Sequence, residues 1–109
     1  MNLDEPIRIV GRKSLIPSEV ILLKADRNYT QLFLNDGSML MVATPLKILE
    51  TRFCASTFFR THKSFIVNLQ FVVDYCHTKV ILSNQEETLL ARRKKTEFFK
   101  LMKKVKNSL

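Results

Sequence analysis

The sequence predicts a single, mainly antiparallel β domain with two helices. Short apolar runs alternate with turn signals through most of the 109 residues, a spacing typical of short strands joined by tight turns. Only two stretches, near 45–53 and 96–106, carry a helical pattern. A chain of this length supports one domain. We expect residues 20–109 to form it, after an N-terminal segment, 1–19, that could hold a short strand.

The first strands are expected at Ile7–Val10 and Val20–Lys24, where apolar residues cluster. Gly11–Ser14 reads as a turn after the first strand, and Pro17–Glu19 interrupts the chain before the second. Asp26–Asn28 is a further turn signal, because Asp and Asn tolerate the left-handed region and bond to their own backbone.

The next two strands, Thr30–Leu34 and Met39–Ala43, are expected to pair as a hairpin. The dipeptide Asp36–Gly37 between them predicts a type I′ turn, since both residues accept a positive φ. Apolar side chains fall on both faces of these strands, with Met39 and Met41 on one of them. We therefore expect a sheet that is covered on both sides.

A short helix is expected at 45–53. Thr44 suits the N-cap, and Pro45 suits the first helical position because the N–H that it lacks would have no partner there. The helix should end near Phe53 or Cys54 and pack one apolar stripe against the sheet. That stripe consists of Leu46, Leu49 and Phe53.

The stretch Phe58–Leu69 begins and ends with apolar residues, which predicts two strands held in the core. Between them, Arg60–Ser64 should form a polar loop, either a rigidly placed recognition loop or an ordinary surface loop. Three more strands follow, with a polar turn at Ser83–Glu86 before the last. These strands are expected at Phe71–Cys76, Lys79–Leu82 and Thr88–Ala91.

The net charge of +8 is concentrated at the C-terminal end. Residues 92–109 hold 8 Lys and Arg against one Glu, whereas residues 1–91 hold 10 Lys and Arg against 9 acidic residues. This distribution indicates an anionic partner, either nucleic acid or membrane lipid, with a merely solvated basic tail as the alternative. The helix 96–106 is amphipathic, and its apolar stripe would also serve to cover the β domain. That stripe consists of Phe98, Leu101, Met102 and Val105.

Catalysis and metal binding find little support. The chain has no Gly-rich phosphate loop and no Gly-x-Ser-x-Gly motif. It also lacks Cys-x-x-Cys and His-x-x-x-His pairs, so we expect no zinc site and no cofactor. Cys54 and Cys76 are expected to be reduced and buried. Without a secretory signal, and with no apolar run longer than Met39–Ala43, the expected location is the cytoplasm.

Three polar clusters interrupt the apolar pattern, each beside a strand: Arg27–Tyr29, Arg60–Ser64 and Arg92–Lys95. Arg and Lys neutralise phosphates and can pair with guanine edges, while Asn and Ser add neutral donors. A single-strand binder would expose aromatic rings for stacking, but the aromatic residues here are mostly Phe within apolar runs. Duplex DNA is therefore the favoured partner. The alternative is a basic-helix module that binds an anionic membrane or the groove of a partner protein.

From about Val20 to Lys95, the sequence resembles the LytTR-type DNA-binding domain. One departure is Gln85, where members of the family often have Gly. The resemblance implies an elongated antiparallel fold in several short sheets, and a bacterial transcriptional regulator of the two-component response-regulator type. It rests on Asp26-Arg27-Asn28-Tyr29, Asn35-Asp36-Gly37, the helix Pro45–Phe53, Ala91-Arg92-Arg93, and above all Phe59-Arg60-Thr61-His62-Lys63-Ser64-Phe65-Ile66-Val67-Asn68-Leu69.

The resemblance also implies a binding mode. Loops would enter successive major grooves of duplex DNA at promoter repeats, with a second copy on the adjacent half-site and no membrane partner. By position, it puts Tyr29, Lys63 and Arg92 at the bases, and makes Asn68 a turn-capping residue. His62 could instead only bond within its own loop. The residues implied to contact the DNA backbone or to support the loops are Arg27, Asn28, Arg60, His62, Ser64, Arg93, Lys94 and Lys95.

Overall fold

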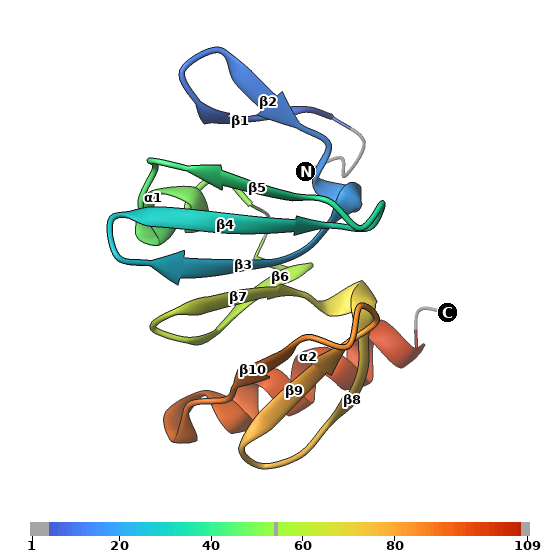
Figure 1. Ribbon diagram of the computed structural model, residues 1–109. Coiled ribbons are helices and arrows are strands. Elements are labelled where there is room, and N and C mark those ends of the chain that lie inside the picture. The colour runs from blue at the N-terminus through green and yellow to red at the C-terminus, as the bar shows by residue number, and fades with distance from the viewer. Residues whose placement is uncertain (1–4, 54, 108–109) are drawn as a thin grey trace.

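The computed structural model describes residues 5–53 and 55–107, which form three antiparallel sheets, two α-helices and three 3-10 turns (Figure 1). The mainly β fold class predicted from the sequence is confirmed. The strands are β1 (Ile7–Val10), β2 (Lys13–Leu15), β3 (Val20–Asp26), β4 (Tyr29–Leu34), β5 (Met39–Val42), β6 (Phe58–His62), β7 (Phe65–Asn68), β8 (Val72–Tyr75), β9 (Lys79–Leu82) and β10 (Glu87–Leu89). The helices are α1 (Leu46–Glu50) and α2 (Lys95–Asn107), and the 3-10 turns are η1 (Pro17–Glu19), η2 (Leu69–Phe71) and η3 (Arg92–Lys94).

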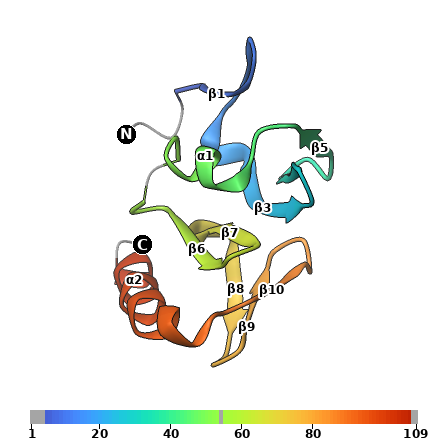
Figure 2. The same cartoon turned by 90° about the vertical axis from the view of Figure 1, so that its left-hand side faces the viewer.

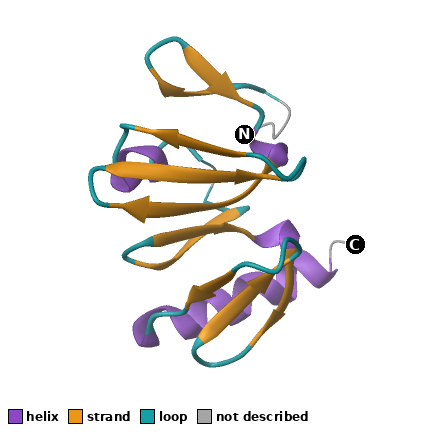
Figure 3. Cartoon of the chain, viewed as in Figure 1, coloured by secondary structure: helices purple, strands orange, loops and turns teal. Residues whose placement is uncertain are grey.

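The sheets are stacked along the molecule, whose extents are 36 × 30 × 24 Å (Figure 3). β1 and β2 form a hairpin at one end, and the three-stranded sheet at the other end has the order β10-β9-β8. The central five-stranded sheet has the order β5-β4-β3-β7-β6. Strand β7 therefore pairs with β3, which lies far from it in the chain, as well as with its neighbour β6.

Two cores flank the central sheet. The first is formed with β1 and α1, and it buries Ile9 and Leu49 completely. The second is formed with the three-stranded sheet and α2, and it buries Val67, Val80 and Phe98 completely. Full burial of such a side chain stabilises a fold by roughly 1.5–3 kcal/mol relative to leaving it exposed. The two cores together hold the sheets in one body.

The N-terminal hairpin is larger than predicted. Lys13–Leu15 form β2 and pair with β1, so the predicted turn over Gly11–Ser14 is wrong beyond its first two residues. Gly11 has a φ of 51°, which allows the chain to reverse within so short a turn. A three-residue strand with one apolar residue has no recognisable periodicity, so only its pairing with β1 reveals it.

The β4–β5 hairpin predicted around Asp36–Gly37 is confirmed, but its turn is not of type I′. Gly37 has a positive φ of 89°, whereas Asp36 does not. The Asp36 carboxylate accepts hydrogen bonds from the hydroxyl (2.5 Å) and the N–H (2.8 Å) of Ser38, and both bonds lower the pKa of Asp36. These bonds stabilise a four-residue loop in place of the two-residue turn.

The prediction that this hairpin is covered on both faces is wrong for β5. Met39 and Met41 are 45% and 49% exposed, whereas Val42, on the opposite face, is 5% exposed. Phe33 on β4 packs against the second core, and that core does not extend to β5. As an edge strand, β5 lies too far from the three-stranded sheet to be covered by it.

Helix α1 begins one residue later than predicted and lacks the predicted cap. Pro45 is the N-cap residue and makes no side-chain capping bond. The Thr44 hydroxyl instead donates to the Ile9 carbonyl oxygen, and the Thr44 carbonyl oxygen accepts a bond from the Thr30 hydroxyl (2.7 Å). Thr44 therefore ties β1 and β4 to the start of α1. The helix ends at Glu50, earlier than predicted.

Helix α2 packs its apolar stripe into the second core, as the sequence predicts. Phe98 and Met102 are 0% and 3% exposed in the second core. The Phe98 ring lies 5.8 Å from that of Phe59 and 5.2 Å from that of Tyr75, between centroids. Among the described residues, no helix has the length and apolar character needed to cross a membrane.

Candidate nucleic-acid interface

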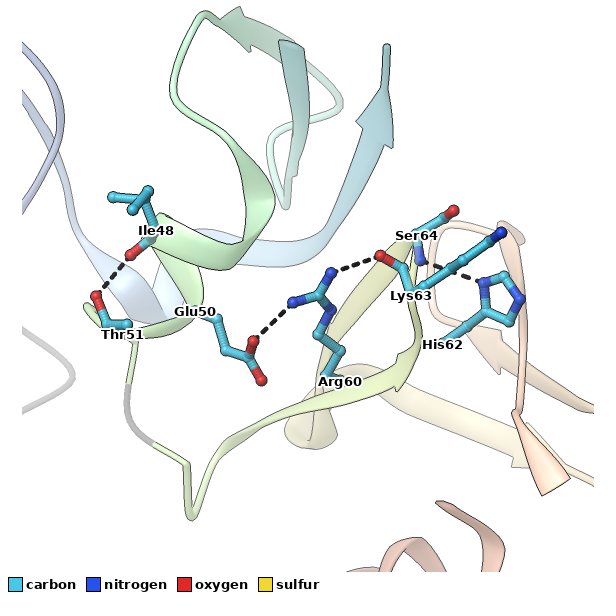
Figure 4. A network of polar contacts seen from close by, with 7 residues as sticks. All are labelled: Ile48, Glu50, Thr51, Arg60, His62, Lys63 and Ser64. Atoms are coloured by element: carbon cyan, nitrogen blue, oxygen red, sulfur yellow. Dashed lines mark hydrogen bonds and ion pairs between the residues drawn. The ribbon is translucent and has the colours of Figure 1, made fainter. Parts of the chain in front are cut away.

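The β6–β7 hairpin is the centre of the candidate interface. β6 continues to His62, so only Lys63 and Ser64 form the turn, and the predicted loop over Arg60–Ser64 is wrong. The strand continues because Thr61 is completely buried against the three-stranded sheet, which the polar sequence does not reveal. The Ser64 N–H donates to His62 Nδ1 (3.2 Å), so His62 does shape its own turn (Figure 4).

The β3–β4 turn lies beside this hairpin because β3 pairs with β7. The Ala25 N–H donates to the Ser64 carbonyl oxygen (2.8 Å), joining the two turns. Arg27 and Asn28 form the β3–β4 turn, in which Arg27 has a φ of 57°, and both are exposed. Tyr29 begins β4 and is 49% exposed. Neighbouring strands lie about 4.8 Å apart, so these side chains extend from adjacent positions.

The junction between β10 and α2 lies on the other side of β6. The Ala91 N–H donates to the Thr61 carbonyl oxygen (2.7 Å), and the hydroxyls of Thr61 and Thr88 lie 3.4 Å apart. The chain then forms η3 and enters α2, so Arg92 follows directly after the contact with β6. Figure 2 views the molecule from the side on which all three segments end. We call the surface formed by residues 27–29, 60–64 and 92–95 the cationic edge.

All three predicted polar clusters thus meet on the cationic edge, although their side chains differ in exposure. The three residues implied to read bases come from three neighbouring segments and are exposed. They are Tyr29, Lys63 and Arg92. Among the others, Arg27, Asn28 and Arg93 are exposed, whereas Arg60, His62, Ser64, Lys94 and Lys95 are half-buried.

Two half-buried cations have partners within the protein. Arg60 Nη1 lies 2.7 Å from Glu50 Oε1, and Arg60 Nη2 donates to the Lys63 carbonyl oxygen (2.6 Å). Lys94 Nζ lies 5.6 Å from the centroid of the Phe59 ring, within the range of a cation–π interaction. These contacts suit Arg60 and Lys94 to supporting the edge.

An open cavity of about 320 Å³ lies on the edge between the β6–β7 hairpin and η3. Basic side chains outnumber acidic ones around it, which favours an anion such as a phosphate group. Glu50 belongs to this site and was not predicted, because nothing in the sequence links a residue of α1 to Arg60, ten positions later. The lining residues are Glu50, Arg60, His62, Lys63, Ala91, Arg93 and Lys94.

Asn68 has the structural role that was predicted for it. The side chain is completely buried, and its amide group donates to the Val20 carbonyl oxygen (2.9 Å). Its Oδ1 accepts a hydrogen bond from the Gln70 N–H (3.0 Å), capping η2. Asn68 therefore fixes the exit of β7 at the end of the hairpin away from the cationic edge.

Cys76 is exposed, which contradicts the prediction that it is buried. β8 ends at Tyr75, so Cys76 lies in the turn before β9, where hydrogen bonds from the backbone N–H and hydroxyl of Thr78 lower the pKa of its thiol. Cys54 lies outside the described residues. Within residues 5–53 and 55–107, no three His, Cys, Asp or Glu side chains are grouped so as to hold a metal ion.

Comparison with known proteins identifies the fold and the family of the chain. Among solved structures, a LytTr DNA-binding domain from Bacillus cereus matches with a TM-score of 0.72 and 21% sequence identity, over 89% of this chain and 95% of that chain. A comparison with curated proteins found no match. The family model for the LytTr DNA-binding domain matches residues 12–103. Since this match spans most of the sequence, the chain belongs to the LytTr DNA-binding domain family.

Proposed function

We propose that the chain binds duplex DNA in a sequence-specific manner through the cationic edge and thereby regulates transcription, without catalysis. The observation that carries this proposal is the meeting of three polar segments, far apart in the sequence, on one edge of the molecule. Membership of a family named for DNA binding supports it. A row of exposed cations neutralises phosphates, and the neighbouring donors can read base edges.

In this proposal, the turns enter successive major grooves and three exposed side chains read the bases. Arg92 has the clearest chemistry, because its planar fork can bond to both acceptors of a guanine. Lys63 would bind a guanine or an adjacent phosphate, and Tyr29 would contact base edges from the β3–β4 turn. Arg27, Asn28, Arg93 and Lys95 would bind the backbone, while Arg60, His62, Ser64 and Lys94 would hold the segments in place.

The proposal extends to the arrangement of sites. A molecule whose longest extent is 36 Å covers a short stretch of duplex, so a promoter would present paired repeats, each bound by one copy of the chain in the bacterial cytoplasm. Short repeats give each copy few base contacts, and specificity then accumulates over two half-sites.

The alternative of a basic-helix module is disfavoured by the packing of α2. Its apolar side chains, including Phe98 and Met102, are buried in the second core. A helix bound to a membrane or in a partner's groove presents its apolar face to that partner, and this face is already occupied. If the chain sediments with anionic vesicles through charge alone, duplex DNA should compete for the same cations and abolish this sedimentation.

Selection from a random duplex pool tests the proposed function directly. We expect one motif to be enriched by the wild-type chain. The double variant Lys63→Ala/Arg92→Ala should lose this enrichment. The matched control Lys100→Ala/Lys103→Ala, which removes two exposed cations of α2 outside the cationic edge, should keep it. Recovery of unenriched sequences by the wild-type chain would contradict specific binding.

A further inference from the structure

We propose that Glu50 of α1 is a positioning residue for the DNA-reading turn at Lys63, and that it acts through Arg60. The inference rests on the proposed function, in that it treats Lys63 as a residue that meets DNA. It adds a residue of α1, outside the three polar clusters. Figure 4 shows the Arg60 side chain between the Glu50 carboxylate of α1 and the Lys63 carbonyl oxygen at the turn.

The first link joins α1 to β6. Glu50 Oε1 lies 2.7 Å from Arg60 Nη1, a distance typical of a charge-assisted hydrogen bond. Glu50 is the last residue of α1, and the Thr51 hydroxyl donates to the Ile48 carbonyl oxygen (2.7 Å) just beyond it. Leu49 anchors this end of the helix in the first core with 0% exposure. The carboxylate is therefore held by a rigid element.

The second link joins Arg60 to the turn. Its Nη2 donates to the Lys63 carbonyl oxygen at 2.6 Å, so one guanidinium bridges α1 and the backbone of the reading turn. The two bonds use two separate nitrogens of a planar fork, whereas a lysine would have to reach both acceptors from a single nitrogen on a flexible stem. The Lys63 carbonyl precedes the Ser64 N–H that donates to His62, so the turn is held from both sides of one peptide bond.

The burial of Arg60 distinguishes this arrangement from an incidental surface ion pair. Its side chain is 22% exposed, compared with 45% for Glu50. Its Nε is buried and has no hydrogen-bond partner among the described residues, which is unfavourable in itself. The bonds at Nη1 and Nη2 offset that loss only while both Glu50 and the Lys63 carbonyl are in place.

The charge of Glu50 gives a second argument. Glu50 lines the open cavity on the cationic edge, together with Lys63 and Arg93. A carboxylate on a surface that binds a polyanion weakens binding by repulsion. If repulsion were its whole effect, its removal would strengthen binding to every duplex. If Glu50 positions the turn, its removal should instead weaken binding to the cognate duplex. Measuring cognate and non-cognate affinity therefore separates repulsion from positioning.

Titration of cognate and scrambled duplexes makes this separation. For Glu50→Ala, we expect cognate affinity to fall roughly tenfold while scrambled-duplex affinity is unchanged or rises. Glu50→Gln should fall between this variant and the wild type, because the amide oxygen still accepts a bond from Arg60. Arg60→Lys keeps the charge but loses the fork, so it should resemble Glu50→Ala. The control Glu86→Gln removes the same charge from the β9–β10 turn and should change neither affinity.

A double-mutant cycle tests whether Glu50 acts through the turn. In a Lys63→Ala background, Glu50→Ala should change cognate affinity less than about twofold, because the side chain that it positions is absent. Losses that add in full would overturn the proposal. Tighter binding of Glu50→Ala and Glu50→Gln to both duplexes would also overturn it, because repulsion alone would then explain Glu50.

A measurement without DNA separates this proposal from the proposed function. By NMR relaxation, the Lys63 and Ser64 amides should gain mobility in Glu50→Ala and Arg60→Lys, with the rest of β6 and β7 unchanged. If the wild-type chain bound no duplex specifically, the proposed function would fail. Increased mobility of the two amides in the variants would still support the positioning role. An unchanged turn in both variants would overturn the positioning role, whatever the DNA results.

Discussion

Arg60 and Arg92 illustrate how one residue type takes two roles on one surface. Arg60 is drawn inward by Glu50 and by the Lys63 carbonyl oxygen, so its donors are occupied by the protein. Arg92 is exposed at the start of η3. A guanidinium that reads a base has to reach its ligand with its fork unoccupied. At the scale of single residues, local partners therefore decide which cations on the edge are suited to DNA.

We predict that Arg92→Ala weakens binding to a cognate duplex by about 1–3 kcal/mol and relaxes preference at one base position, since the bidentate contact to guanine is lost. Fluorescence anisotropy with a set of single-base variants measures both effects. The matched variant Arg93→Ala should weaken all duplexes alike and flatten the salt slope by about one unit. Unchanged affinity and base preference in Arg92→Ala would show that this residue does not read a base.

At the scale of elements, the β9–β10 turn places one residue in a backbone conformation that favours glycine. Gln85 has a φ of 72°, in the region that favours glycine. The Gln85 N–H donates to the Leu82 carbonyl oxygen (2.9 Å), and the Leu82 N–H donates to the Glu86 carbonyl oxygen (3.0 Å). These two bonds close the β9–β10 turn around the strained position. The sequence departure at Gln85, where the family often has glycine, therefore falls where glycine fits best.

Gln85→Gly is expected to stabilise the fold by about 0.5–1 kcal/mol. Glycine relieves the backbone strain at this positive φ, and the greater conformational entropy that it gives the unfolded chain offsets part of that gain. Urea denaturation should show a higher midpoint with an unchanged slope. The control Ser83→Gly, in the same turn but without a positive φ, should lower the midpoint. The β9–β10 turn lies away from the cationic edge, so DNA affinity should not change (Figure 1). A lower midpoint for Gln85→Gly would contradict this account of the turn.

At the scale of the whole molecule, the two cores bring the polar segments together. The second core packs α2 and the three-stranded sheet against the central sheet, which places η3 beside β6. The pairing of β3 with β7 places the β3–β4 turn beside the β6–β7 turn. Four of the eight cationic residues near the C-terminus, those of Arg92–Lys95, are thereby joined in space to Arg27 and Lys63.

A steep salt dependence should follow from this arrangement. If the exposed cations of the edge and Lys95 make four or five phosphate contacts, affinity should fall roughly 10²–10³-fold between 50 and 200 mM salt, because each contact releases counterions. Titrations across this range give the slope of log K against log salt. A slope near zero would mean that the cationic edge does not bind the phosphate backbone.

Much of this protein could be predicted from neighbouring residues alone. Alternating apolar runs and turn residues predicted most strands, and the stripe from Phe98 to Val105 predicted the packing of α2. The three polar clusters were recognised because each interrupts an apolar pattern. Such signals have periods of two or about four residues, so they are complete within a short window of sequence.

The tertiary structure decided the features that depend on distant partners. Thr44 bonds to β1 instead of capping α1, β2 exists only through its pairing with β1, and Thr61 is buried by the three-stranded sheet. The bridge from Glu50 through Arg60 to Lys63 likewise joins α1 to the β6–β7 turn. Hydrogen bonds and burial of this kind arise only when the chain has brought remote segments into contact, and no local pattern records them. The residue types of the edge were therefore determined by the sequence, and their arrangement side by side by the fold.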